Sequence, residues 1–104
     1  MDLISQAQQG GGIYFFSKDG CRYCSALSAL LIELGLPYRA IKVSDKEKAT
    51  VANHTGMKTF PMLFFGNELI GGYDNFCQLV NFNSQLLEQK LNANNINVKP
   101  KQLF

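Results

Sequence analysis

The sequence predicts one α/β domain with a four-stranded mixed β-sheet and helices on both faces of that sheet. The apolar run Ile13–Phe16 is typical of a strand buried on both faces, which places it inside a sheet. Four leucines between residues 27 and 34 recur at the spacing of one helix face. The pair Gly66-Asn67 joins two β-favouring segments as a hairpin turn. The chain has 104 residues, which is the length of a single domain.

The first half of the chain is expected to alternate helices and strands. We predict a short helix over Leu3–Gln9, closed by a run of glycines, and then the strand Ile13–Phe16. The leucine helix runs from Cys24 to a left-handed cap at Gly35, and a proline follows soon after. Alternating residues predict a second strand over Tyr38–Val43. A strand–helix–strand unit of this length forms a parallel pair through a right-handed crossover.

The middle of the chain should add one helix and a hairpin. Ser44 and Glu47 have the spacing of a capping box, with Ser44 as the N-cap of a helix that ends at Gly56. The strands Met62–Phe65 and Glu68–Ile70 then extend the sheet in antiparallel fashion.

Two short helices are expected to complete the domain. Asp74 is a good N-cap for the first of them, which should stop at the break Asn81–Asn83. Ser84 can cap the last helix, which runs to about residue 92. Residues 93–104 are rich in asparagine and contain a proline, so we expect a flexible polar tail there. The predicted domain therefore covers residues 1–92.

Composition and charge exclude several classes of protein. Ten Lys+Arg against eight Asp+Glu leave a net charge of +2, which does not fit a strongly basic nucleic-acid-binding module. The longest apolar runs are far shorter than the ~20 residues that span a bilayer. The N-terminal residues lack the basic region and apolar core of a signal peptide. We therefore expect a cytoplasmic protein with no nucleic-acid or membrane partner, in a compartment where structural disulfides are rare.

Two of the three cysteines, Cys21 and Cys24, lie where the buried strand has ended and the leucine helix begins. The unpaired N–H groups and the dipole of a helix N-terminus stabilise an anion, which here would be a thiolate. Lys18 and Arg22 add positive charge on either side of Cys21, so we expect the pKa of its thiol to lie well below the ordinary value. Cys24 lies one helical turn further on. We therefore predict that Cys21 attacks a disulfide and that Cys24 resolves the product.

Two other interpretations of these cysteines, a pair of zinc ligands and two inert thiols, are weaker. Half of a zinc site also contains a Cys-x-x-Cys pair, but only His54 and Cys77 could complete it, at separations that match no usual second half-site. His54 is better explained as an exposed or helix-capping residue. Cys77 is expected to be an inert thiol, because free cysteine commonly behaves as a small apolar residue. No metal is expected.

Three separate motifs resemble those of the glutaredoxin family. The segment Phe16–Cys24 is similar to the family's active-site segment, in which a lysine precedes the first cysteine by three residues. Thr59–Pro61 resembles the family's Thr-Val-Pro loop, and Gly71–Asn75 resembles its Gly-Gly-x-Asp segment. The resemblance runs from about Ile13 to Leu91 and implies a thioredoxin-like fold. It also implies an enzyme, a dithiol oxidoreductase that uses glutathione as its reductant.

The resemblance implies how glutathione would be held. Lys18, with help from Lys58, would bind the glycyl carboxylate, and the backbone of Phe60 would pair with the cysteinyl part as an added strand does. The N-terminus of the helix after the two glycines suits the γ-glutamyl carboxylate, and Asp74 could accept from the amine. Pro61 is expected to follow a cis peptide bond. The complete predicted glutathione site is Lys18, Tyr23, Lys58, Thr59, Phe60, Pro61, Gly72, Tyr73 and Asp74.

The sequence departs from the family's pattern at two positions. Arg22 stands where dithiol members usually carry proline, and Phe60 replaces the common valine. Members that lack this proline can bind a 2Fe–2S cluster between two subunits, through the first cysteine and glutathione. A cluster-binding glutaredoxin is therefore an alternative, although the bulk of Arg22 argues against it.

Two further alternatives share the fold. One is a redoxin that is reduced by thioredoxin reductase and that in turn reduces ribonucleotide reductase. Such a redoxin would carry Trp-Ser-Gly-Phe in place of Gly71–Asp74, and this chain has no tryptophan. A binding module would need no nucleophile, so the intact cysteine pair argues against it. We expect a monomer whose partners are glutathione and disulfide-containing or glutathionylated proteins. The resemblance adds ribonucleotide reductase as a candidate partner.

Overall fold

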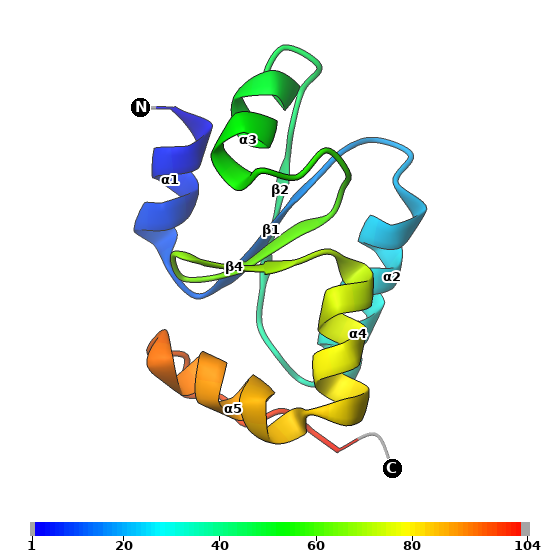
Figure 1. Ribbon diagram of the computed structural model, residues 1–104, viewed down its shortest axis with the longest axis vertical. Coiled ribbons are helices and arrows are strands. Elements are labelled where there is room, and N and C mark those ends of the chain that lie inside the picture. The colour runs from blue at the N-terminus through cyan, green and yellow to red at the C-terminus, as the bar shows by residue number, and fades with distance from the viewer. Residues whose placement is uncertain (1, 103–104) are drawn as a thin grey trace.

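The computed structural model describes residues 2–102 (Figure 1). Met1 of the predicted domain and residues 103–104 of the predicted tail lie outside the described residues. Along the chain the elements are α1 (Leu3–Gly10), β1 (Ile13–Ser17), α2 (Arg22–Glu33), β2 (Arg39–Lys42), α3 (Lys48–Thr55), β3 (Met62–Phe65), β4 (Glu68–Gly71), α4 (Tyr73–Phe82) and α5 (Ser84–Ala93). Within residues 2–102, no helix has the length and apolar character needed to cross a membrane.

The strands form one mixed sheet in the order β2-β1-β3-β4. β1 is parallel to β2, with Phe15 opposite Ala40, and antiparallel to β3, with Phe15 opposite Leu63. β3 and β4 form the predicted hairpin, in which Gly66 has a φ of 61° that glycine adopts without steric cost. The central position of β1 and the four-stranded mixed sheet confirm the predicted fold class. β2 and β4 are the two edge strands.

Helices cover both faces of the sheet because β1 and β3 are apolar on both sides. One core cluster joins Phe15 of β1 to Leu27 of α2, Phe76 of α4 and two leucines of α5. The other joins Tyr14 of β1 to side chains of α1 and to Val51 of α3. In Figure 1, α1 and α3 accordingly lie on one side of the sheet, and α2, α4 and α5 lie on the other.

The start of α3 differs from the prediction. Ser44 is not its N-cap, because the hydroxyl of Ser44 donates to the Glu47 carboxylate at 2.8 Å instead of accepting from the helix. The same carboxylate accepts the backbone N–H of Ser44 at 3.0 Å. The two residues therefore close a turn, and the helix begins after it, at Lys48.

The starts of α4 and α5 also differ from the prediction. α4 begins at Tyr73 with Gly72 as N-cap, because the side-chain oxygen of Asn75 accepts the Gly72 N–H at 2.9 Å, so Asp74 lies in the first turn. α4 ends at Phe82, within the predicted break Asn81–Asn83. The N-cap of α5 is Asn83 rather than Ser84, since its side-chain oxygen accepts the backbone N–H of Leu86 at 3.3 Å.

Residues 93–102, most of the predicted tail, pack against the helices. Ile96 is buried in the core cluster that α2, α4 and α5 share. The backbone N–H of Lys101 donates to the carbonyl of Leu34 at 2.8 Å. This part of the tail therefore contributes to the packing of the domain. The domain boundary at residue 92 and the flexibility of the tail stay predictions.

Arg39 on the edge strand β2 ties the end of α1 to the sheet. Its Nη2 atom donates to the carbonyls of Ala7 at 2.9 Å and Gly11 at 2.7 Å. Its guanidinium carbon lies 5.1 Å from the centre of the Tyr14 ring. The C-terminus of a helix has unpaired carbonyls and a partial negative charge, both of which a cation stabilises.

We expect Arg39→Met to lower the free energy of unfolding by about 1–2 kcal/mol, because it removes two charge-assisted hydrogen bonds to backbone carbonyls. Denaturant unfolding followed by circular dichroism measures the change. The matched control is Lys46→Met, since Lys46 is exposed and makes no ion pair among the described residues. The control should shift stability by less than about 0.5 kcal/mol. Equal losses in the two variants would contradict the role of Arg39.

Candidate active site

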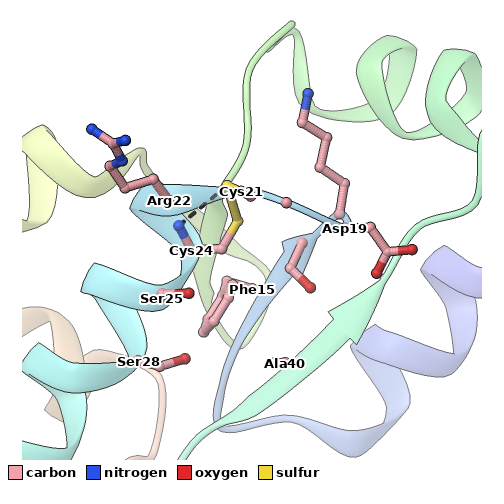
Figure 2. Close-up of a pocket in the computed structure, with 11 residues that line it drawn as sticks. Phe15, Asp19, Cys21, Arg22, Cys24, Ser25, Ser28 and Ala40 are labelled. Carbon is pink, nitrogen blue, oxygen red and sulfur yellow. Dashed lines mark hydrogen bonds between the residues drawn. A yellow bond between two sulfur atoms is a disulfide. The ribbon is translucent and has the colours of Figure 1, made fainter.

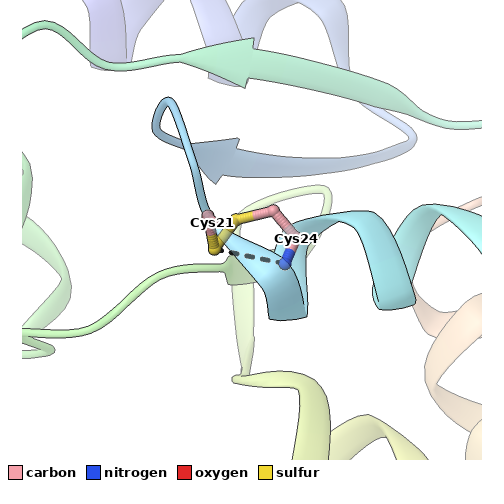
Figure 3. Close-up of a disulfide and its surroundings, with 2 residues drawn as sticks. All are labelled: Cys21 and Cys24. Atoms are coloured by element: carbon pink, nitrogen blue, oxygen red, sulfur yellow. Dashed lines mark hydrogen bonds between the residues drawn. A yellow bond between two sulfur atoms is a disulfide. The ribbon is translucent and has the colours of Figure 1, made fainter.

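Cys21 and Cys24 are joined by a disulfide at the N-terminus of α2 (Figure 3). Cys21 is the N-cap residue, and its Sγ atom accepts the backbone N–H of Cys24 at 3.2 Å. The two Cα atoms are 5.2 Å apart. Cys24 is only 7% exposed, whereas Cys21 is half-buried. The accessible sulfur thus has a helix N–H directed at it, and this arrangement suits the predicted roles of attacking Cys21 and resolving Cys24.

Two cations next to Cys21 make no ion pair among the described residues. Lys18 is exposed, with its Nζ atom 5.8 Å from the centre of the Phe60 ring. Arg22 is the first residue of α2, and Figure 2 shows its side chain pointing away from the disulfide. The carboxylate of Asp19, in the loop before Cys21, is paired with Lys42 at 2.8 Å. The positive charge of Lys18 and Arg22 is therefore available to an anion at this end of the sheet.

The loop before β3 provides the second motif. The Phe60–Pro61 peptide bond is cis, as the resemblance implied, and Pro61 is buried. The Phe60 ring lies near Lys18, which brings this loop beside the loop that carries the cysteines. Lys58 and Thr59 are exposed in the same loop, and neither side chain has a hydrogen bond or ion pair among the described residues.

The start of α4 lies next to the cis-proline loop and next to the first turn of α2, which carries the cysteines. A Cβ atom built on Gly72 would lie 3.8 Å from the carbonyl oxygen of Pro61, so the helix begins against the cis-proline loop. The rings of Tyr23 and Tyr73 have their centres 5.9 Å apart, so the first turns of α2 and α4 lie side by side. The structure therefore brings the three predicted motifs together at one end of the sheet.

Asp74 lies in the first turn of α4 and is exposed. Because Asn75 supplies the bond at the helix start, the Asp74 carboxylate has no hydrogen bond or ion pair among the described residues. It is thus a free acceptor next to the N–H groups of a helix N-terminus, which attract anions. The first turn of α4 therefore offers N–H groups that can bind an anion and a carboxylate, that of Asp74, that can bind a cation.

Cys77 and His54, the two residues that the sequence analysis considered as additional zinc ligands, both have neighbours that they interact with. A hydrogen bond with the half-buried thiol of Cys77, one turn further along α4, raises the pKa of the Tyr73 phenol. His54 is exposed, stacks on Phe64 with ring centres 6.2 Å apart and lies 3.4 Å from the amide nitrogen of Gln8. Within residues 2–102, no group of three or more His, Cys, Asp and Glu side chains gathers as a metal site.

A groove of about 400 Å³ opens at the disulfide between α2 and the edge strand β2 (Figure 2). Its walls include Ser25 and Ser28 of α2 and Ala40 of β2, and none of its lining residues comes from the cis-proline loop or α4. The sequence analysis did not predict this groove. The available signal was two serines at i and i+3 in the first half of the leucine helix, which indicate a side of the helix that is not packed into the core.

Comparison with known proteins agrees with this geometry. Residues 13–70 match the protein family described as Glutaredoxin. A glutaredoxin of Ricinus communis is 32% identical over 79 residues, which cover 71% of this chain and 78% of that protein. Glutaredoxin-C2 of Arabidopsis thaliana is 33% identical over 79 residues, which cover 71% of each chain.

Solved structures of glutaredoxins also superpose on this chain. The buckwheat glutaredoxin–glutathione complex has a TM-score of 0.74 and 29% identity, covering 86% of this chain and 84% of that one. Reduced glutaredoxin C1 from Populus tremula x tremuloides has a TM-score of 0.74 and 28% identity, covering 94% and 87% of the two chains. Fold and site together define a thiol–disulfide oxidoreductase with the thioredoxin fold and a dithiol active site. The chain belongs to the glutaredoxin family.

The family match covers the cysteine pair and the cis-proline loop but ends at residue 70. The third motif, Gly71–Asn75, lies beyond it. For that segment, the closeness of Gly72 to the Pro61 carbonyl and the contact of the Tyr73 ring with the Tyr23 ring are the observations that connect it with the site.

Proposed function

We propose that this protein uses glutathione to reduce protein disulfides and glutathione mixed disulfides. The observation that carries the proposal is the meeting of three features at one end of the sheet: an accessible cysteine at a helix N-terminus, unpaired cations beside it, and the open N-terminus of α4. The buckwheat relative was solved as a complex with glutathione. The proposed partners are disulfide-containing or glutathionylated proteins, and we propose that the protein acts as a monomer in the reducing cytosol.

Each binding group of glutathione has a suitable side chain or backbone counterpart among the described residues. Glutathione carries two carboxylates and one amine, so a site for it needs cations, free N–H groups and one acceptor. Lys18 and Lys58 suit the glycyl carboxylate, and the first turn of α4 suits the γ-glutamyl carboxylate. The unpaired carboxylate of Asp74 suits the amine. The backbone of Phe60, next to the cis-proline, would pair with the cysteinyl part between them.

The proposed reaction is two thiol–disulfide exchanges followed by reduction. The Cys21 thiolate attacks one sulfur of the substrate disulfide, forms a mixed disulfide and releases the other substrate sulfur as a thiolate. The Cys24 thiolate then attacks the Cys21 sulfur, which releases the second substrate thiol and leaves the Cys21–Cys24 disulfide seen in this structure. One glutathione opens that disulfide to a Cys21–glutathione mixed disulfide, and a second releases it as glutathione disulfide.

A coupled assay tests the choice of reductant. The protein is given bis(2-hydroxyethyl) disulfide and NADPH, with either glutathione plus glutathione reductase or thioredoxin reductase alone. We expect NADPH oxidation in the first mixture and none above background in the second. Turnover with thioredoxin reductase only would overturn the glutathione proposal and favour the redoxin alternative.

Charge reversal in the proposed glutathione site should weaken the use of glutathionylated substrate. We expect Lys18→Glu and Asp74→Lys each to raise KM for a glutathionylated peptide about twofold to fivefold, because exposed charge contacts are worth roughly 0.5–1 kcal/mol. The single-turnover reaction of the reduced protein with a small disulfide, without glutathione, should change less. Lys99→Glu reverses an exposed charge outside the site and serves as the control. A double variant that keeps its full apparent affinity would show that glutathione binds elsewhere.

A further inference from the structure

We propose that the groove between α2 and β2 binds an extended segment of the protein substrate next to its disulfide. This proposal rests on the proposed function and assigns the side on which a polypeptide, rather than glutathione, approaches Cys21. Glutathione would occupy the side formed by the cis-proline loop and α4. The remainder of the substrate must then leave the disulfide on another side of Cys21, and the groove is open there.

The groove runs from the two cysteines to the middle of the edge strand. Cys21 and Cys24 line one end of it, and Ala40 of β2 lines the other (Figure 2). Phe15, which lies opposite Ala40 in the sheet, is buried beneath it. Because alanine has the smallest side chain of the strand Arg39–Lys42, a larger residue at position 40 would fill the space that the groove occupies.

The lining of the groove is polar and mostly uncharged. The hydroxyls of Ser17, Ser25 and Ser28 make no hydrogen bond among the described residues, and Figure 2 shows the oxygens of Ser25 and Ser28 facing the groove. A hydroxyl both donates and accepts, so these three can pair with the N–H and C=O groups of a peptide backbone. Asp19 at the rim is already paired with Lys42. The cations Lys18 and Arg22 line only the end of the groove next to the cysteines, where glutathione would be held, and the serines and Ala40 make the remainder suitable for a neutral peptide backbone.

The outer wall of the groove is a free sheet edge. β2 pairs with β1 alone, so the backbone groups on its other side have no strand to pair with. Its residues are mostly exposed. Free edges of this kind accept an extended chain by main-chain hydrogen bonding. A segment that follows the groove therefore has the hydroxyls of α2 on one side, the edge of β2 on the other and Cys21 at its end.

Substrate length tests the proposal. We would compare two glutathionylated peptides, one of three residues and one of about twelve residues, since an extended chain advances ~3.3 Å per residue. The wild-type protein should have a kcat/KM about fivefold to tenfold higher for the long peptide, a difference that a few hydrogen bonds supply. Ala40→Phe should remove this preference while changing the short peptide far less. Ala29→Phe, at an exposed alanine of α2 outside the groove, should keep it.

The outcomes separate this proposal from the proposed function. Failure to turn over either peptide with glutathione would overturn the proposed function. Normal turnover of both without a length preference, or a preference that survives Ala40→Phe, would overturn the groove. Should Ala40→Phe fold poorly, Ser28→Leu fills the same groove from the α2 side and must give the same loss.

A trapped complex tests the location directly and without glutathione. In a Cys24→Ser, Cys77→Ser background, the Cys21 thiolate displaces thionitrobenzoate from the activated cysteine of the long peptide, which leaves a stable Cys21–peptide disulfide. Hydrogen exchange of residues 39–42 should slow in this complex and stay unchanged when the three-residue peptide is attached. Unchanged exchange with the long peptide would overturn the proposal. Slower exchange with glutathione alone would also overturn it, because the groove would then be a glutathione site.

Discussion

Cys21→Ser is expected to abolish every activity of this protein, whereas Cys24→Ser should lose only the reduction of protein disulfides. The two cysteines differ because Cys21 is accessible at the helix N-cap and Cys24 is buried one turn further on. Without Cys24, no protein thiol can release a substrate that is joined to Cys21. On a glutathionylated protein this step is unnecessary, since a second glutathione can act as the resolving thiol.

Two assays on the same variants measure this difference. Deglutathionylation of a peptide, coupled to glutathione reductase, should persist in Cys24→Ser and fall to background in Cys21→Ser. Reduction of an intramolecular protein disulfide should fall to background in both. Cys77→Ser, which removes the free thiol of α4, is the control and should keep both activities. If Cys24→Ser were as inactive as Cys21→Ser in deglutathionylation, the assignment of roles would be wrong.

Alkylation should also distinguish the cysteines. After reduction, iodoacetamide at pH 6 is expected to label Cys21 about 100-fold faster than Cys77, because the N-terminus of α2 directs a backbone N–H at the Cys21 sulfur and the cation Lys18 lies three residues before it. Cys77 lies in the middle of α4, half-buried and paired with Tyr73. Quenched samples digested and analysed by mass spectrometry give the rate at each thiol. In Lys18→Glu the labelling of Cys21 should slow, and faster labelling of Cys77 than of Cys21 would contradict the account.

The sheet and its layers could be predicted because each depends on a strong local pattern. The apolar run Ile13–Phe16 needs cover on both faces, which an inner strand of the sheet provides. The exact first residues of the helices could not be predicted, because several neighbouring residues are each able to act as the N-cap. Asp74 is a good cap by type, but the bond from Gly72 to Asn75 starts the helix earlier.

The candidate site was predictable where residues lie within one motif. The spacing of Cys21 and Cys24 at a helix start already implies that one sulfur is accessible and the other shielded. The groove beside them was not predictable, because it depends on sheet register. That Ala40 lies opposite Phe15, and so leaves space along α2, follows from the pairing of β1 with β2 and not from either segment alone.

The central claim is that Cys21 carries glutathione during the reaction, and peptide mapping of Cys24→Ser by mass spectrometry tests it most directly. The reduced variant is mixed with glutathione disulfide, digested without reductant and mapped, and a second sample receives excess glutathione before analysis. The account predicts one glutathione on Cys21, formed quickly and removed by the added glutathione, with Cys77 unmodified on the same timescale. Glutathione found first on Cys77, or no adduct on Cys21, would contradict it.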